Sequence, residues 1–210
     1  GLADTDGLSG ALYSIGTMAA CLWLVSPFFV NFAWFKNPII WIFVITGILF
    51  PAGSQTAQIF SVQKLGPTLT SALGSLAPVF AVIPAILILG EVLNFQAGLG
   101  LAIIVSAMIY STLGSKKLPR NWPIWALALP FGASLARGIT QPFTKLGMLE
   151  IPSPIFASMV QATISLVVIF LVTSLPVNRK LRRIGPGGRR WFCVTGVLIS
   201  CGILSLNWAI

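Results

Sequence analysis

The chain has 210 residues, of which 56% are hydrophobic and 8% are charged. A soluble domain has about 25% charged residues, because polar side chains must cover its core. This composition excludes a soluble globular domain and predicts an integral membrane protein, with membrane lipids as its surroundings. The formal net charge is +9, but the basic residues gather in short connectors such as Lys116–Arg120 and Arg179–Arg190. Positive charge that flanks apolar segments is typical of membrane proteins, so we expect no nucleic-acid partner.

Seven apolar segments are long enough to cross a bilayer, which takes about 20 residues of α-helix. In chain order they are Leu8–Val30, Ile39–Ser61, Thr68–Leu89, Phe95–Leu113, Trp122–Thr144, Pro154–Leu175 and Trp191–Ile210. Short connectors rich in Gly, Pro and charged residues separate them, as expected of turns between helices. The sequence therefore predicts an all-α integral membrane fold, a polytopic helical bundle.

The second and seventh segments share a residue pattern at an offset of 149 residues, the separation of Phe43 from Phe192. The shared positions are Phe43, Thr46-Gly47, Leu49 and Gly53 in one segment and Phe192, Thr195-Gly196, Leu198 and Gly202 in the other. At the same offset the first segment overlays the sixth. The third to fifth segments then have no partner in the chain, so we expect a repeat of five helices. Residues 1–114 form the first repeat without its first helix, and residues 115–210 form the second without its last two.

A repeat with an odd number of helices places its second copy in the opposite orientation, as in many secondary transporters, whose solute site lies between the repeats. We therefore expect two inverted five-helix repeats, truncated at both ends. On this interpretation the intact protein has ten helices, with one before Gly1 and two after Ile210.

A series of short motifs lies between Gly47 and Thr112. In order they are Gly66-Pro67, the stretch Leu73–Val79 with Pro78, Leu89-Gly90-Glu91 and Gln96-Ala97-Gly98. Their order and spacing resemble the last three helices of an EamA-like repeat of the drug/metabolite transporter superfamily. The resemblance implies a ten-helix transporter of small metabolites, of which this chain holds about helices two to eight. We interpret Gly66, Pro67, Pro78, Glu91 and Gly98 as structural motif residues; Pro78 and Pro84 remove backbone donors and can kink one helix.

Polar side chains inside predicted spans are the candidates for a solute site, because they are costly in lipid and normally face a cavity. Gln55 and Gln58 lie on one side of the second span, and Arg137 and Gln141 are one helical turn apart on the fifth. An arginine can bind a carboxylate or phosphate through two parallel hydrogen bonds. We therefore predict these four as substrate-binding residues.

Two alternatives stay open at this point. Arg137 can extend instead toward the water interface near Lys145, and the glutamines can serve only as hydrogen bonds between helices. Gln161, Thr163 and Asn207 are weaker candidates of the same kind.

The chain has no histidine, and its only acidic residues, Asp4, Asp6, Glu91 and Glu150, lie outside the predicted spans or at their ends. Catalysis within the membrane needs carboxylates, a nucleophile with a base, or metal ligands. We therefore expect no enzyme, no cofactor and no metal site.

The prediction is a multi-pass transporter that moves amino acids or organic anions by alternating access; the alternative is a membrane-embedded sensor or structural protein without transport. Small residues after Gly98 permit a homodimer.

The connectors alternate between the two sides of the membrane. One side carries Lys64 and both basic stretches, whereas Lys36 and Lys145 on the other are offset by Glu91 and Glu150. The positive-inside rule makes the first side cytoplasmic, but the family resemblance, with both termini inside, implies the opposite. The orientation therefore stays open, and we expect a plasma-membrane location, that of a bacterial inner-membrane protein.

Overall fold

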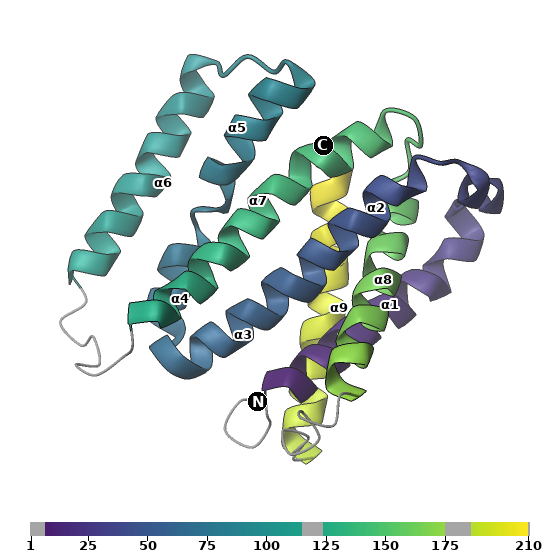
Figure 1. Ribbon diagram of the computed structural model, residues 1–210, viewed down its shortest axis with the longest axis horizontal. Helices are drawn as coiled ribbons and strands as arrows, with labels where there is room; N and C mark the ends of the chain where they lie inside the picture. The colour runs from purple at the N-terminus through teal and green to yellow at the C-terminus, as the bar shows by residue number, and fades with distance from the viewer. Residues whose placement is uncertain (1–6, 115–123, 175–185, 210) are drawn as a thin grey trace. The chain divides into compact units, whose positions relative to one another are not determined.

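A computed structural model describes residues 7–114, 124–174 and 186–209 (Figure 1). The basic stretch Lys116–Arg120 lies outside the described residues, as do residues 179–185 of the second basic stretch and Trp122 at the predicted start of the fifth span. Every regular element in the described ranges is a helix. The prediction of an all-α, polytopic helical bundle is therefore confirmed.

The described elements follow the chain as a series of helices and short helical turns. They are α1 (Gly7–Phe29), η1 (Phe32–Lys36), α2 (Ile40–Gly47), η2 (Ile48–Gly53), α3 (Ser54–Leu65), α4 (Pro67–Gly74), α5 (Ala77–Leu89), α6 (Phe95–Gly114), η3 (Ile124–Leu127), α7 (Ala128–Met148), α8 (Pro154–Ser174) and α9 (Pro186–Ala209). The chain divides into two compact units: the first contains residues 1–56 and 143–210, and the second contains residues 57–142. The division into two repeats after residue 114 concerns the sequence register and stays a prediction.

Five stretches in the described ranges are long and apolar enough to cross a membrane. They are Gly7–Phe29, Ile40–Leu65, Pro67–Leu89, Pro154–Ser174 and Gly187–Asn207. The sequence predicted seven. The helix at Phe95–Tyr110 is apolar but shorter, and α7 is less hydrophobic because it contains Arg137, Gln141 and Lys145.

Two close helix crossings in the first unit are built around glycine. A Cβ on Gly47 of α2 would lie 2.9 Å from backbone atoms of Gln161 on α8, and one on Gly196 of α9 would collide with the carbonyl oxygen of Ser14 on α1. Small residues allow helices to approach closely in lipid, where packing rather than water exclusion drives association. Gly47 and Gly196 are also the pair that the 149-residue offset superimposes.

The predicted second span is not one continuous helix. Between α2 and α3 the chain passes through the π-helical segment η2, in which Phe50 has an extended backbone (φ −145°, ψ 128°). Pro51 accounts for the break, because a proline disfavours the helical conformation of the residue before it. Proline also lacks an N–H, so the carbonyl of Gly47, four residues earlier, has no donor at the usual helical position.

The predicted third span is likewise two helices, α4 and α5. Gly66 precedes α4 with φ 83°, and Pro67 occupies the first turn. Pro78 lies in the first turn of α5, where the missing N–H costs nothing; it starts a helix instead of kinking one. Gly90 follows the last residue of α5 and has a left-handed conformation (φ 65°), and the N–H of Glu91 bonds back to the carbonyl oxygen of Ala85 at 3.3 Å.

The second unit packs its helices through small apolar clusters. Leu65 and Leu69, at the turn between α3 and α4, bury against Ala126 of η3. The rings of Phe80 on α5 and Phe131 on α7 meet edge to face with centroids 5.0 Å apart. Gly98 lies in the first turn of α6, where an added Cβ would make only ordinary contact with Leu93. These contacts place α3, α5 and α7 around the polar side chains described next.

Candidate solute-binding site

Arg137 lies in the middle of α7 and contacts Gln58 of α3. A terminal guanidinium nitrogen, Nη2, donates to the side-chain Oε1 of Gln58 at 2.9 Å, and Arg137 is half-buried. Both residues belong to the second unit. Two of the four predicted substrate-binding residues are therefore in direct contact, 79 positions apart in the sequence.

The position of Arg137 depends on its neighbour Gly138. A Cβ at Gly138 would lie 2.5 Å from the carbonyl oxygen of Ala77 and 2.7 Å from the Cβ of Phe80, so α7 crosses α5 in close contact at this point. One turn earlier, the Ser134 hydroxyl donates to the carbonyl oxygen of Leu73 at 2.7 Å. The crossing and this hydrogen bond fix α7 on both sides of the guanidinium.

Gln58 and Gln141 complete the polar group in the second unit. The side-chain nitrogen of Gln58 lies 3.5 Å from the Cβ position of Gly74, so the amide is held between α4 and α7. Gln141 is one turn beyond Arg137 on α7, and its Oε1 is buried with no hydrogen-bond partner among the described residues. A buried acceptor without a donor is uncommon in proteins and suits a site that a ligand donor enters.

Gln55 lies in the first unit instead. Its side-chain nitrogen donates to the hydroxyl of Ser14 on α1 at 2.7 Å, and both side chains are buried. The structure thus brings together Gln58 and Arg137, with Gln141 next to them on α7, and gives Gln55 a partner in the other unit. Its role as a solute contact stays a prediction.

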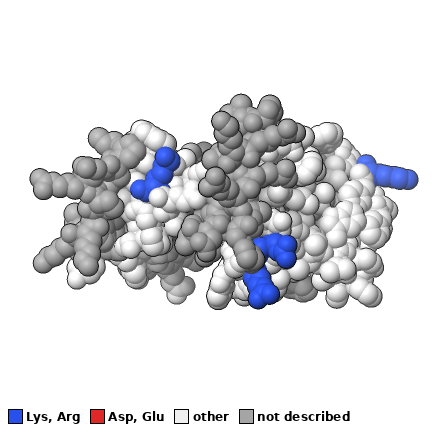
Figure 2. Space-filling view, turned by 90° about the horizontal axis from the view of Figure 1, so that it is seen from below, with Lys and Arg blue, Asp and Glu red and all other residues white. Residues whose placement is uncertain are grey.

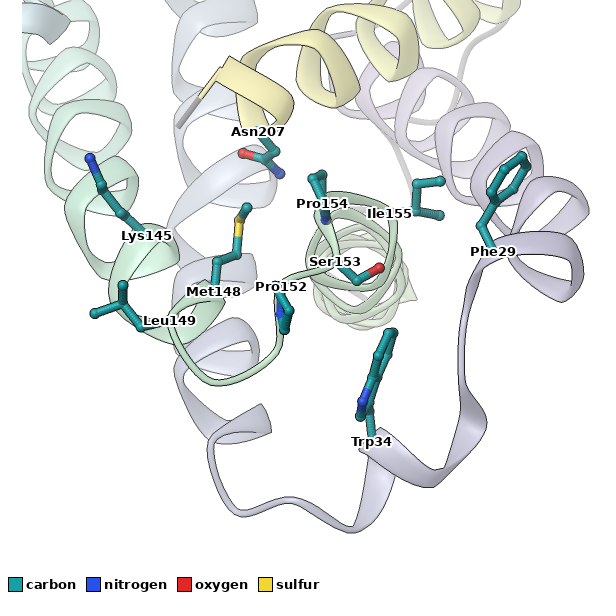
Figure 3. A pocket seen from close by; sticks show the side chains of 10 residues that line it. All are labelled: Phe29, Trp34, Lys145, Met148, Leu149, Pro152, Ser153, Pro154, Ile155 and Asn207. Carbon is teal, nitrogen blue, oxygen red and sulfur yellow. The ribbon is translucent and has the colours of Figure 1, made fainter.

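A cavity of about 490 Å³ lies within the first unit, at the end of the helices where α8 begins (Figure 3). Its walls come from α1, η1, α7, α8 and α9, and include Trp34, Lys145, Ser153 and Asn207. Figure 3 shows these side chains arranged around the first turn of α8. The walls are mainly apolar, and an aromatic residue such as Trp34 at a helix end is typical of the membrane–water interface.

Residues 6–113 match the model of the EamA-like transporter family. The chain belongs to this family. A comparison with curated proteins found no match. Members of the EamA-like family are transporters and not enzymes, so the protein is an integral membrane transporter of small molecules, in agreement with the resemblance seen in its motifs.

A row of polar residues on α8 holds the first unit of this EamA-like transporter together. The Nε2 of Gln161 donates to the hydroxyls of Thr46 at 3.0 Å and Thr144 at 2.8 Å. One turn away on either side, Ser158 accepts from the side chain of Asn207 at 2.8 Å, and Ser165 bonds Gly47 at the end of α2 and Ala52 of η2. We define Ser158, Gln161 and Ser165 as the α8 polar row.

Gln161 and Asn207 are only weak candidates from their sequence positions, and Ser165 is not among the predicted site residues. The usable signal was the spacing: the α8 polar row occupies positions i, i+3 and i+7, which lie on one face of a helix. Its partners could not be found in this way, because they come from α2, η2, α7 and α9.

One face of the described part of the transporter carries few charged side chains. Figure 2 shows one face, on whose described part the Lys and Arg side chains form separate blue spots and no acidic side chain is visible. Lys64 at the end of α3 lies 4.9 Å from the ring centroid of Trp125. Basic and aromatic residues at helix ends are typical of the membrane–water interface.

Proposed function

We propose that the protein carries small solutes with a carboxylate group, amino acids or organic anions, across the plasma membrane by alternating access. The position of Arg137 and its hydrogen bond to Gln58 support this proposal. Its guanidinium lies half-buried in the middle of α7, a helix without Asp or Glu, and it donates to the neutral amide oxygen of Gln58. A cation in the membrane normally lines a water-filled cavity and marks a solute or ion pathway.

The chemistry of the three side chains favours an amino acid within this class. A guanidinium presents its N–H groups as a planar fork that matches a carboxylate. In our proposal the carboxylate replaces the Gln58 oxygen that Arg137 binds without solute. The buried Oε1 of Gln141, one turn along α7, then accepts an N–H of the solute's ammonium group.

Alternating access follows from the predicted inverted repeats, whose rocking would expose the site to each side in turn. The site must then lie near the membrane midplane, and the central position of Arg137 in α7 supports this. A bacterial inner membrane is the proposed location, since the short basic connectors are those expected of a small multi-pass protein of that membrane.

The test is uptake by proteoliposomes that contain the full natural chain. Labelled glutamate, leucine, malate and putrescine sample acidic, neutral, purely anionic and cationic solutes. We expect uptake of one or more carboxylates, no uptake of putrescine, and a loss of about tenfold or more in Arg137→Ala, because a charge-assisted hydrogen bond is lost. Arg137→Lys keeps the charge without the fork and should retain only part of the flux.

Lys145→Ala is the matched control, because Lys145 is the other basic residue of α7 and also half-buried. It should transport like the parent protein. Equal flux in folded Arg137→Ala and parent protein would overturn the assignment of Arg137. Binding of a carboxylate without flux in the parent protein would favour a membrane-embedded sensor.

A further inference from the structure

Ser165 of α8 lies opposite the break in the helix that runs from Ile40 to Leu65. Its hydroxyl donates to the carbonyl oxygen of Gly47 at 2.5 Å and accepts the N–H of Ala52 at 3.2 Å. The side chain has 0% of its surface exposed. One hydroxyl therefore bonds the backbone on both sides of the extended residue Phe50.

The break in the helix leaves backbone polar groups that need hydrogen-bond partners, and Ser165 provides one. Non-helical backbone at membrane depth is tolerated only where it lines water or is buried against protein groups that satisfy it. Pro51 has no N–H to offer the carbonyl of Gly47, and the Ser165 hydroxyl supplies a donor. The same oxygen then serves as an acceptor for Ala52, so both of its hydrogen-bonding functions are used.

The helices that the 149-residue offset superimposes differ at the break and at the position of this hydroxyl. The 149-residue offset places Gly47 on Gly196, Phe50 on Ile199 and Ser165 on Gly16. Helix α9 runs without interruption through Ile199, and Gly16 has no side chain. Both crossings thus have a glycine contact, but at the position of Ser165 the partner of the broken helix carries a hydroxyl and the partner of α9 has glycine.

We propose that Ser165 is a positioning residue that fixes the direction of α3 at a hinge in η2. Helix α3 starts directly after η2 and carries Gln58, the partner of Arg137. With both backbone bonds to Ser165 in place, residues 47–52 are held in one backbone conformation; when they open, this segment bends about Phe50. The hinge itself does not depend on which solute is carried; only its use in transport rests on the function proposed above.

Hydrogen exchange of the full natural chain in lipid nanodiscs tests the hinge without any solute. In Ser165→Ala, which removes both bonds and adds no bulk, we expect amides in residues 48–54 to exchange about tenfold faster, because buried hydrogen bonds are lost. Amides of α8 itself should be unchanged. The matched control is Thr173→Val, since Thr173 is also buried on α8 but its hydroxyl donates to the carbonyl oxygen of Phe170 within the same helix.

A distance measurement checks that α3 changes direction. Spin labels at Trp41 of α2 and Gln63 of α3, both exposed, should give one narrow distance distribution in the parent protein and a broader one in Ser165→Ala. Unchanged exchange in residues 48–54, or faster exchange along the whole of α8, would overturn the proposal. Because neither readout uses flux, failure here is distinguishable from failure of the transport assignment.

Discussion

At the scale of single residues, Gly138 is the position where one methyl group should matter most for the candidate site. A Cβ there would meet the backbone oxygen of Ala77 at 2.5 Å, and backbone cannot move aside as a flexible side chain can. We expect Gly138→Ala to lower the free energy of unfolding by about 1–3 kcal/mol, the usual cost of overpacking. It should also separate α7 from α5 and so shift the adjacent Arg137.

Gly132 provides the control on the same helix. No atom lies within 4 Å of a Cβ at this position, and alanine favours a helix over glycine by about 1 kcal/mol. Gly132→Ala should therefore leave stability unchanged or raise it slightly. Thermal unfolding in detergent, followed by circular dichroism, compares the two variants. Equal stability of both would show that α7 and α5 are not in close contact at Gly138.

Individual site residues were predictable from the sequence, but their contacts with one another were not. Arg137 and Gln58 were found because charge and amide groups inside an apolar segment are costly and therefore informative. Their mutual contact, and the bond of Gln55 to Ser14 instead, depend on packing between segments 79 and 41 positions apart. Periodicity within one helix carries no information on such distances.

At the scale of elements, the helix positions were predictable and the breaks were not. The segment Pro154–Leu175 agrees with α8 because a proline begins it and no proline or glycine follows within it. The segment Ile39–Ser61 contains Pro51, but prolines are tolerated in membrane helices when neighbours satisfy the freed backbone groups. The group that bonds the backbone freed by Pro51 is Ser165, which lies more than a hundred positions away and cannot be identified from the segment itself.

Two glycines that border α4 and α5 differ in a way that substitution can reveal. Gly66 has φ 83° and ψ 166°, a region open essentially to glycine alone, whereas Gly90 has φ 65° and ψ 21°, the left-handed region that asparagine also adopts. Both have open space around a Cβ. We expect Gly66→Asn to lower the free energy of unfolding by about 1–3 kcal/mol and Gly90→Asn to change it little.

Chemical unfolding of the two variants side by side measures this difference. Because a Cβ on either glycine has no atom within 4 Å beyond its chain neighbours, crowding at the Cβ contributes to neither result. A similar decrease in the free energy of unfolding in both variants would mean that the backbone at Gly66 relaxes to a conformation that asparagine can adopt.

At the scale of the whole molecule, the distribution of basic residues and the family resemblance predict opposite orientations in the membrane. The side of Lys64 also collects both basic stretches of the sequence, whereas Lys36 and Lys145 on the other side are offset by Glu91 and Glu150. Lysine and arginine in short connectors resist translocation, and acidic residues contribute little to topology. We therefore expect the side of Lys64 to be cytoplasmic.

Cysteine labelling in intact cells decides the orientation. In a background with Cys21, Cys193 and Cys201 replaced by alanine, Lys36→Cys should react with a membrane-impermeant maleimide from outside. Lys64→Cys should react only after the membrane is opened; both lysines are exposed at helix ends, so accessibility reports the side and not burial. The reverse pattern would show that the family topology prevails over the local charge. The basic connectors would then have to cross the membrane during insertion, at a cost that the positive-inside rule counts as unfavourable.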